Sequence, residues 1–215
     1  MNQNKCIAVI LAGGKSSRMG QPKGLLDYYG EYWLLEQLRR LKSADVKSVY
    51  IGLGYDADTY FKALPFLEKA LSKSINYKEV EIRIILNPEP QLGAFSTLKK
   101  VLENIPANND ALIIPIDVPL LSSKELKQLI NTSGYIVKPF YKSKSGHPIK
   151  VSRTVIEKLI LLADDARLDE FINSYPTSEI KQILCADWQI GYNINTLEQW
   201  KAYKLLIKNR NNLES

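Results

Sequence analysis

The sequence predicts a three-layer α/β fold of the Rossmann-like kind, with helices on both faces of a mixed, mostly parallel sheet. Two observations predict it. Short runs rich in isoleucine and valine alternate along the chain with longer runs in which apolar residues recur at helical spacing. The hydrophobic share of 45% also supplies enough apolar material for a sizeable core. Alternation of this kind is typical of parallel strands joined by crossover helices.

The predicted elements follow in order along the chain. Strands are expected at residues 5–11, 47–53, 82–86, 111–116, 135–140, 148–151 and 180–185. Helices are expected around residues 34–41, 61–71, 98–102, 126–130, 156–160 and 168–172. Pro65 should kink or split the second helix. Ser122 with Glu125, and Thr196 with Gln199, form capping boxes that start the fourth helix and a last one.

The middle of the chain departs from the alternation. Residues 141–146 separate two predicted strands and are too few for a crossover helix, so this part is expected to be antiparallel or a lid-like excursion. No linker, repeat or low-complexity segment interrupts the chain. We therefore expect a single domain over residues 1–207 and a frayed tail over residues 208–215, beginning at Lys208.

Composition excludes several classes of protein. No apolar run approaches the roughly 18 residues of a membrane helix, and the run at residues 6–12 is β-branched and lacks the cleavage site of a signal peptide. We expect a cytoplasmic protein with no membrane association. Cys6 and Cys185 are too few for a disulfide framework, and one histidine leaves no Cys/His metal spacing. The net charge of +6 suits nucleic acid, an anionic surface or phosphorylated small molecules.

The segment after the first strand carries the strongest functional signal. It contains three glycines, two serines and three cations, which offer hydrogen-bond donors and positive charge, in the run Leu11, Ala12, Gly13, Gly14, Lys15, Ser16, Ser17, Arg18 and onward to Lys23. Glycines let backbone N–H groups approach a ligand, and open α/β sheets bind ligands at this edge. The spacing fits neither a P-loop nor a dinucleotide fingerprint. We expect a polyphosphate here.

Residues 11–23, LAGGKSSRMGQPK, resemble the L-A-[AG]-G-x-[SG]-x-R-[ML]-G-x-x-K signature of MobA-like nucleotidyltransferases, the molybdenum cofactor guanylyl- and cytidylyltransferases. The resemblance implies the nucleotide-diphospho-sugar transferase type of fold. It implies that Gly13 and Gly14 lie near the base and ribose, and that Arg18 and Lys23 hold the triphosphate. Near residue 93, Gly93 and Ser96 resemble nucleotide-binding residues of the cytidylyl branch.

Residues 114–121 resemble the family's P-x-D-x-P-L motif, whose aspartate binds magnesium. Independently, a carboxylate that follows an apolar strand, such as Asp117, is held at the ligand edge, and Mg²⁺ prefers carboxylates together with phosphate oxygens. Residues 191–198 resemble a stretch that completes the metal or phosphate site, with Asn195 as a metal ligand and Asn193 as a substrate contact. Leu197 and Gln199 depart from that pattern. Both asparagines also suit simple capping of the last helix. His147, in a Gly-His-Pro similar to the cytidylyl branch, is a further substrate-binding candidate or a plain loop residue.

The resemblance implies an Mg²⁺-dependent transfer of NMP from an NTP to molybdopterin, with Arg18, Lys23 and Asp117 as the catalytic residues. Residues 11–14 favour GTP, whereas residues 93–98 and 146–148 favour CTP. The implied partners are the NTP, a phosphorylated pterin and, transiently, a molybdoenzyme or its chaperone. A sugar-phosphate nucleotidyltransferase remains an alternative. A non-catalytic nucleotide- or nucleic-acid-binding protein is another, although the basic residues form no stripe interleaved with aromatic side chains.

Overall fold

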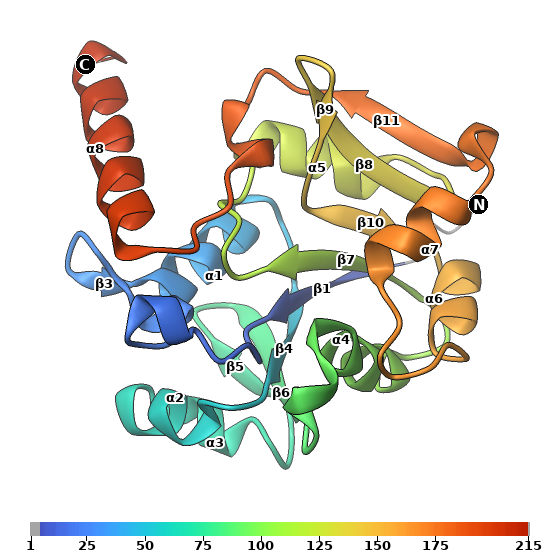
Figure 1. Cartoon of the computed structure of the whole chain (residues 1–215), viewed down its shortest axis with the longest axis horizontal. Helices are drawn as coiled ribbons and strands as arrows, with labels where there is room; N and C mark the ends of the chain where they lie inside the picture. The colour runs from blue at the N-terminus through green and yellow to red at the C-terminus, as the bar shows by residue number, and fades with distance from the viewer. Residues whose placement is uncertain (1–4, 215) are drawn as a thin grey trace.

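The computed structural model describes residues 5–214 of the chain and the side chains of residues 5–210. Its centre is a nine-stranded sheet in the order β11-β8-β10-β7-β1-β4-β6-β5, with β9 beside β8 (Figure 1). The middle strands β7 (Asn109–Pro115), β1 (Lys5–Leu11), β4 (Ser48–Leu53) and β6 (Val80–Leu86) are all parallel. The predicted, mostly parallel sheet is therefore confirmed.

The antiparallel strands lie toward the two edges of the sheet. On one side β10 (Ile149–Val151) runs antiparallel to both β7 and β8 (Ile136–Tyr141), while β11 (Ile180–Leu184) lies parallel to β8. Strand β9 (Lys144–Ser145) folds back on β8. At the other margin β5 (Ile75–Tyr77) pairs antiparallel with β6. The expectation of an antiparallel middle region is confirmed for β8, β9 and β10.

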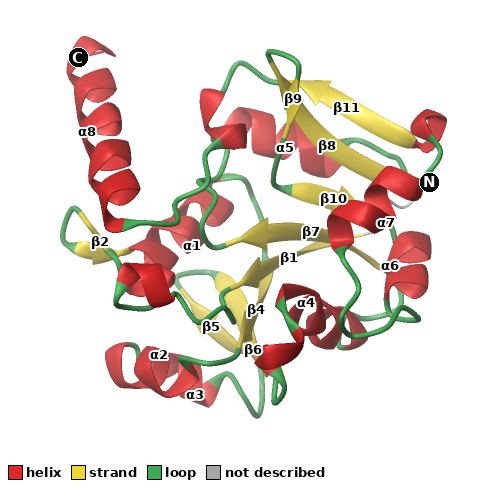
Figure 2. Cartoon of the chain, viewed as in Figure 1, coloured by secondary structure: helices red, strands yellow, loops and turns green. Residues whose placement is uncertain are grey.

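Helices cover both faces of the sheet, and each face has its own core (Figure 2). One core takes the inward leucines of α1 (Trp33–Ser43), α3 (Phe66–Lys69) and α5 (Ser123–Asn131), together with α2 (Ala57–Ala63). The other takes the apolar side chains of α4 (Ala94–Glu103), α6 (Arg153–Leu159) and α7 (Leu168–Ser174). Alternate residues of β1 enter opposite cores, as the two-residue period of a strand requires.

Several local predictions can be compared with the structure. The chain divides at Pro65 into α2 and α3, and in both predicted capping boxes the cap hydroxyl accepts a backbone N–H: Glu125 N–H at Ser122 and Gln199 N–H at Thr196. Helix α8 (Leu197–Glu214) continues past Lys208, where the sequence predicts a frayed tail. The small hairpin of β2 (Asp27–Tyr28) and β3 (Glu31–Tyr32) and strand β5 were missed, because such short strands carry no period.

Helix α8 stands at the margin of the molecule, with the C-terminus at its far end (Figure 1). Its first turns are held by buried Trp200 and Tyr203, which join the core beside α1. Over the described residues, no helix combines the length and apolar character required to cross a membrane.

Candidate functional site

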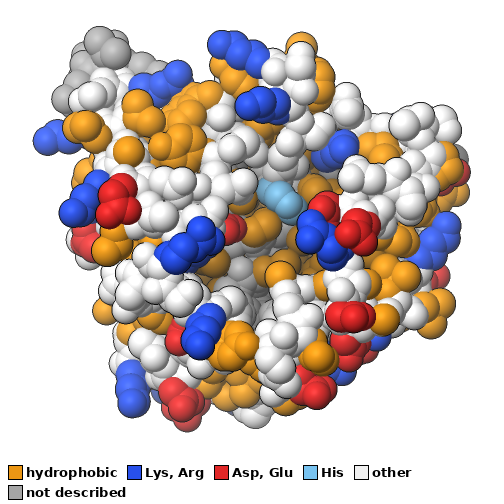
Figure 3. Space-filling view, viewed as in Figure 1, with side chains coloured by type: hydrophobic (Ala, Val, Ile, Leu, Met, Phe, Trp, Pro, Cys, Tyr) orange, Lys and Arg blue, Asp and Glu red, His pale blue; other side chains and the backbone are white. Residues whose placement is uncertain are grey.

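A cavity of about 780 Å³ opens at the carboxyl ends of β1 and β7. Its walls come from parts of the chain that are distant in sequence: the glycine-rich loop after β1, the start of α4, the segment after β7, the loop that leads into α7, His147 and Ile149 at the start of β10, and Asn195 before α8. Figure 3 shows this face hollowed, with the histidine inside the hollow and side chains of both charges around it. Ligands of open α/β sheets bind at this edge.

The predicted phosphate loop forms one wall. Every residue from Leu11 to Met19 lines the cavity, and so does Lys23. Ser16 adopts the left-handed conformation, with φ of 49°, and its hydroxyl accepts the backbone N–H of Lys23 at 3.3 Å. Lys15, Ser17 and Arg18 are exposed on the rim, where their donors are free to meet a solvated anion. The structure thus brings the predicted nucleotide-binding residues of this loop together.

Gly13 is required by packing. A Cβ at this position would lie 2.8 Å from Thr97 Oγ1 and 3.3 Å from the backbone nitrogen of Gly54. The neighbouring Gly14, by contrast, is exposed, and a Cβ there would point into open space with no contact within 4 Å. Packing therefore explains why position 13 is a glycine, whichever nucleotide base is bound.

Lys23, Asp117 and Asn195 meet at one point of the cavity wall. The Lys23 ammonium donates to Asp117 Oδ2 at 2.9 Å and to Asn195 Oδ1 at 2.8 Å. The three residues come from the 3-10 turn after the glycine loop, the segment that follows β7 and the segment that precedes α8. Asp117 and Asn195 are also joined through the backbone, because Ile194 N–H donates to the carbonyl of Asp117 at 2.9 Å.

The donor set of this cluster fits a hard divalent cation. Two side-chain oxygens, one carboxylate and one amide, already converge on a single positive charge, the Lys23 ammonium. Mg²⁺ is commonly held by one or two protein oxygens while phosphate oxygens and waters fill its other positions. Among the described residues, no group of three or more His, Cys, Asp and Glu side chains could hold a metal without such help. The residues therefore suit a cation that arrives with a phosphorylated ligand.

His147 lies in the floor of the same cavity. Its Nδ1 is buried and has no hydrogen-bond partner among the described residues. Burial lowers the pKa of His147, because desolvation outweighs the opposing effects of the Ile113 backbone and the Asp117 charge. The lowered pKa favours the neutral imidazole at pH 7.

Two predicted residues lie outside the cavity lining. The Ser96 hydroxyl is buried behind the wall, where it donates to the Gly93 carbonyl at 2.8 Å and accepts from the Asn87 amide at 2.8 Å. The Ser96 hydroxyl is thus engaged with the backbone at the start of α4, while Gly93, with φ of 104°, does line the cavity. Asn193 is exposed and does not line the cavity, whereas Asn195 does. Asn195 alone reaches the site.

The far wall of the cavity was missed from the sequence. It consists of Asp165, Arg167 and Asp169 together with apolar residues of α7. Arg167 is paired with Asp169 at 2.8 Å and with Glu170 at 3.1 Å. No motif marks these residues, since only the packing of α7 over the sheet brings them opposite the glycine loop.

Comparison with known proteins agrees with this geometry. The family model described as the MobA-like NTP transferase domain matches residues 8–180. The molybdenum cofactor guanylyltransferase of Xanthomonas euvesicatoria pv. vesicatoria (strain 85-10) is 26% identical over 202 residues, which cover 92% of this chain and 94% of that protein.

Solved structures show the same fold. Rv0371c from Mycobacterium tuberculosis H37Rv matches with a TM-score of 0.74 at 21% identity, covering 94% of this chain and 98% of that one. The complex of Rv0371c with manganese matches with a TM-score of 0.67 at 19% identity, covering 92% and 97%. The predicted nucleotide-diphospho-sugar transferase type of fold is confirmed.

Proposed function

We infer the reaction from one premise: this chain belongs to the MobA-like NTP transferase family and is a nucleotidyltransferase. It transfers a nucleoside monophosphate from an NTP, GTP in preference to CTP, to the phosphate of molybdopterin and releases pyrophosphate. The observation that carries this proposal is the convergence of Lys23, Asp117 and Asn195 beside a donor-rich glycine loop.

The chemistry requires little beyond alignment and charge. The attacking group is a phosphate monoester with a second pKa of about 6, so it is largely ionised at neutral pH without a general base. The backbone N–H groups and hydroxyls of residues 13–17 bind the phosphates, and Arg18 and Lys23 neutralise the charge of the departing pyrophosphate. Holding both reactants in one cavity lowers the entropic cost of their encounter.

Asp117 and Asn195 would hold the divalent ion, which we propose to be Mg²⁺. When bound, the ion supplies charge neutralisation and orientation for the phosphates. Lys23, which contacts both oxygens here, would then be the cation available to the phosphate chain. The manganese complex of the structurally similar Rv0371c supports a divalent ion in this fold.

The acceptor would lie over His147 and against α7. His147 and the apolar residues Leu168 and Ile172 of α7 line the same cavity as the glycine loop and leave room there for a second reactant. GTP is favoured by the name of the guanylyltransferase relative and by residues 11–14, although the packing of Gly13 weakens that second argument.

The test measures ligand binding and then turnover. The thermal midpoint is recorded with ATP, GTP, CTP or UTP, with and without Mg²⁺, since a ligand that binds the native state must raise it. Pyrophosphate release is then measured with molybdopterin and, in parallel, with sugar 1-phosphates. We expect release with GTP and molybdopterin only. Pyrophosphate release with a sugar 1-phosphate would show that the acceptor is a sugar phosphate and not molybdopterin. A salt-sensitive rise of the thermal midpoint with an oligonucleotide, and none with a nucleotide, would refute the enzymatic proposal.

A further inference from the structure

The segment that carries Asp117 is buried although it is not part of the sheet. Ile116, Val118, Leu120 and Leu121 each expose 7% of their surface or less. Backbone carbonyls in such a segment need hydrogen-bond donors, because buried and unpaired carbonyls are costly. The position of Asp117 at the cavity wall therefore depends on what donates to its neighbours.

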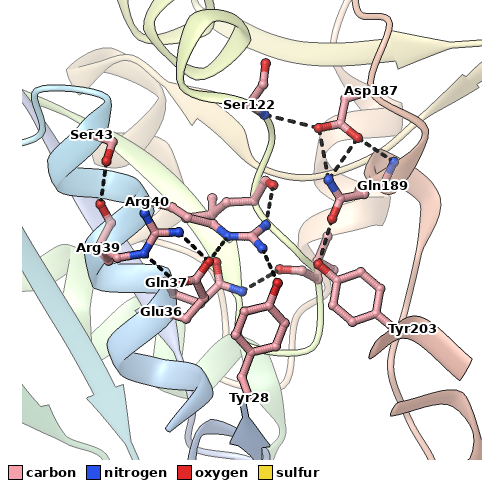
Figure 4. A network of polar contacts seen from close by, with 12 residues as sticks. Tyr28, Glu36, Gln37, Arg39, Arg40, Ser43, Ser122, Asp187, Gln189 and Tyr203 are labelled. Atoms are coloured by element: carbon pink, nitrogen blue, oxygen red, sulfur yellow. Dashed lines mark hydrogen bonds and ion pairs between the residues drawn. The ribbon is translucent and has the colours of Figure 1, made fainter. Parts of the chain in front are cut away.

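Helix α1 supplies three donors in a row. Trp33 Nε1 donates to the carbonyl of Ile116 at 2.8 Å. Further along the helix, the Gln37 amide meets the carbonyl of Val118 at 3.5 Å and the Arg40 guanidinium that of Leu120 at 3.2 Å. The three helical residues are four and three positions apart, so they share one face, and they meet every second carbonyl of the segment. Figure 4 shows Gln37 and Arg40 reaching from α1 to this segment.

The other side of the segment is held by residues near the start of α8. Ser122 N–H donates to Asp187 Oδ2 at 3.1 Å, Asp187 accepts from Gln189, and Gln189 accepts from Tyr203 at 2.7 Å (Figure 4). With the bond from Ile194 N–H to the Asp117 carbonyl, the segment is fixed between α1 and the stretch that carries Asn195.

Trp33 occupies a particular place in this arrangement. Its backbone N–H donates to the carbonyl of Leu26 at 2.9 Å, and Leu26 N–H donates to the carbonyl of Lys23 at 3.2 Å. Its indole holds the peptide immediately before Asp117. One residue, 1% exposed, thus connects the turn of Lys23 with the segment of Asp117.

We propose that Trp33 is a positioning residue for the metal-binding carboxylate: its indole N–H fixes the orientation of Asp117 relative to Lys23 and Asn195. The proposal rests on the proposed function for the ion but concerns a residue without contact to it. Losing the N–H leaves the Ile116 carbonyl without this donor and frees the peptide that carries Asp117. The affinity for the ion should fall, whereas the affinity of the glycine loop for the nucleotide should stay unchanged.

The chain offers a matched control. Trp200 lies 5.2 Å from Trp33, ring centre to ring centre, and is 4% exposed in the same aromatic cluster. Within the described part of the chain its indole donates no hydrogen bond. Trp33→Phe and Trp200→Phe therefore make the same substitution in the same cluster, and only the first removes a donor to the Asp117 segment.

The experiment measures affinity for α,β-methylene-GTP by calorimetry, once with Mn²⁺ and once in EDTA, on folded wild type and both variants. The ratio of the two affinities reports what the ion adds. For Trp33→Phe we expect this ratio to fall about tenfold, as outer-shell substitutions do, with the EDTA affinity unchanged. Trp200→Phe should keep the wild-type ratio. Gln37→Leu removes the next donor and should lower the ratio too, by a smaller factor. This variant replaces Trp33→Phe in the test if Trp33→Phe does not fold.

Equal ratios in wild type and folded Trp33→Phe, or an equal fall in Trp200→Phe, would overturn the positioning role while leaving the proposed function in place. A wild-type ratio of one would show that no ion assists nucleotide binding. That outcome contradicts the metal-dependent reaction itself, and the inference with it.

Discussion

Two lysine–aspartate pairs lie at the opposite ends of β7, and they differ in what surrounds them. At the amino end, Lys150 and Asp110 are joined at 3.3 Å with 6% and 10% of their side chains exposed. At the carboxyl end, Lys23 and Asp117 are joined at 2.9 Å with 15% and 26% exposed. The first pair is enclosed, whereas the second opens onto the cavity.

The partners of each pair explain the difference. Lys150 also donates to the carbonyls of Ile130 and Thr132, at 2.8 and 3.0 Å, and Asp110 accepts the backbone N–H of Arg153. These partners are fixed backbone groups that tie three elements together. Lys23 instead has a second side-chain partner, Asn195, and the pair lies open to a ligand. A satisfied, enclosed pair serves the fold, and an accessible pair with exchangeable partners serves binding.

The largest effect on stability is expected at the enclosed pair. Lys150→Met removes the ammonium from a buried ion pair and from two backbone carbonyls, and we expect the free energy of unfolding to fall by about 3–5 kcal/mol. Urea denaturation measures this. Adding Asp110→Asn removes the buried negative charge and should restore part of the loss. If Lys150→Met alone is as stable as wild type, the enclosed pair does not have the stabilising role assigned to it.

At the open pair the same kind of truncation should act on turnover instead. Lys23→Ala and Asp117→Ala each remove one preorganised charge, and we expect pyrophosphate release to fall by about 10²–10³-fold. The thermal midpoint without ligand should change little, because the cavity lets water replace the lost partner. Near-normal release from folded Asp117→Ala would remove the metal assignment.

The smallest effect concerns pH and the neighbour of the open pair, His147. Its pKa in the folded state is lowered by burial, so the stability due to the neutral ring is present above the ordinary pKa near 6.5 and is lost as pH falls below it. Urea denaturation in EDTA at about pH 7.5 and about pH 5.5 should show lower stability at the acidic value. Since the chain has one histidine, His147→Asn should reduce this difference; an identical difference in both proteins would contradict the assigned pKa.

Much of the site was predictable because its signals are local. The run of glycines, serines and cations after a buried strand predicts a phosphate loop, and Asp117 after another strand predicts a carboxylate at the same edge. In the structure both line one cavity, and Lys23 reaches Asp117 directly. Ser96 and Asn193 were placed by resemblance to short motifs. Local packing turns Ser96 into the turn before α4 and leaves Asn193 exposed.

The amino-acid sequence by itself determined the order of the strands and helices, the parallel core of the sheet and the chemistry of the glycine loop, because periodicity, caps and strand ends are properties of neighbouring residues. Only the tertiary structure decided which asparagine meets Lys23, which wall faces the loop, and that the Trp33 indole holds the peptide before Asp117. Those contacts join residues far apart in the chain. Their existence depends on how α1, α7 and α8 pack on the sheet, which no local pattern records.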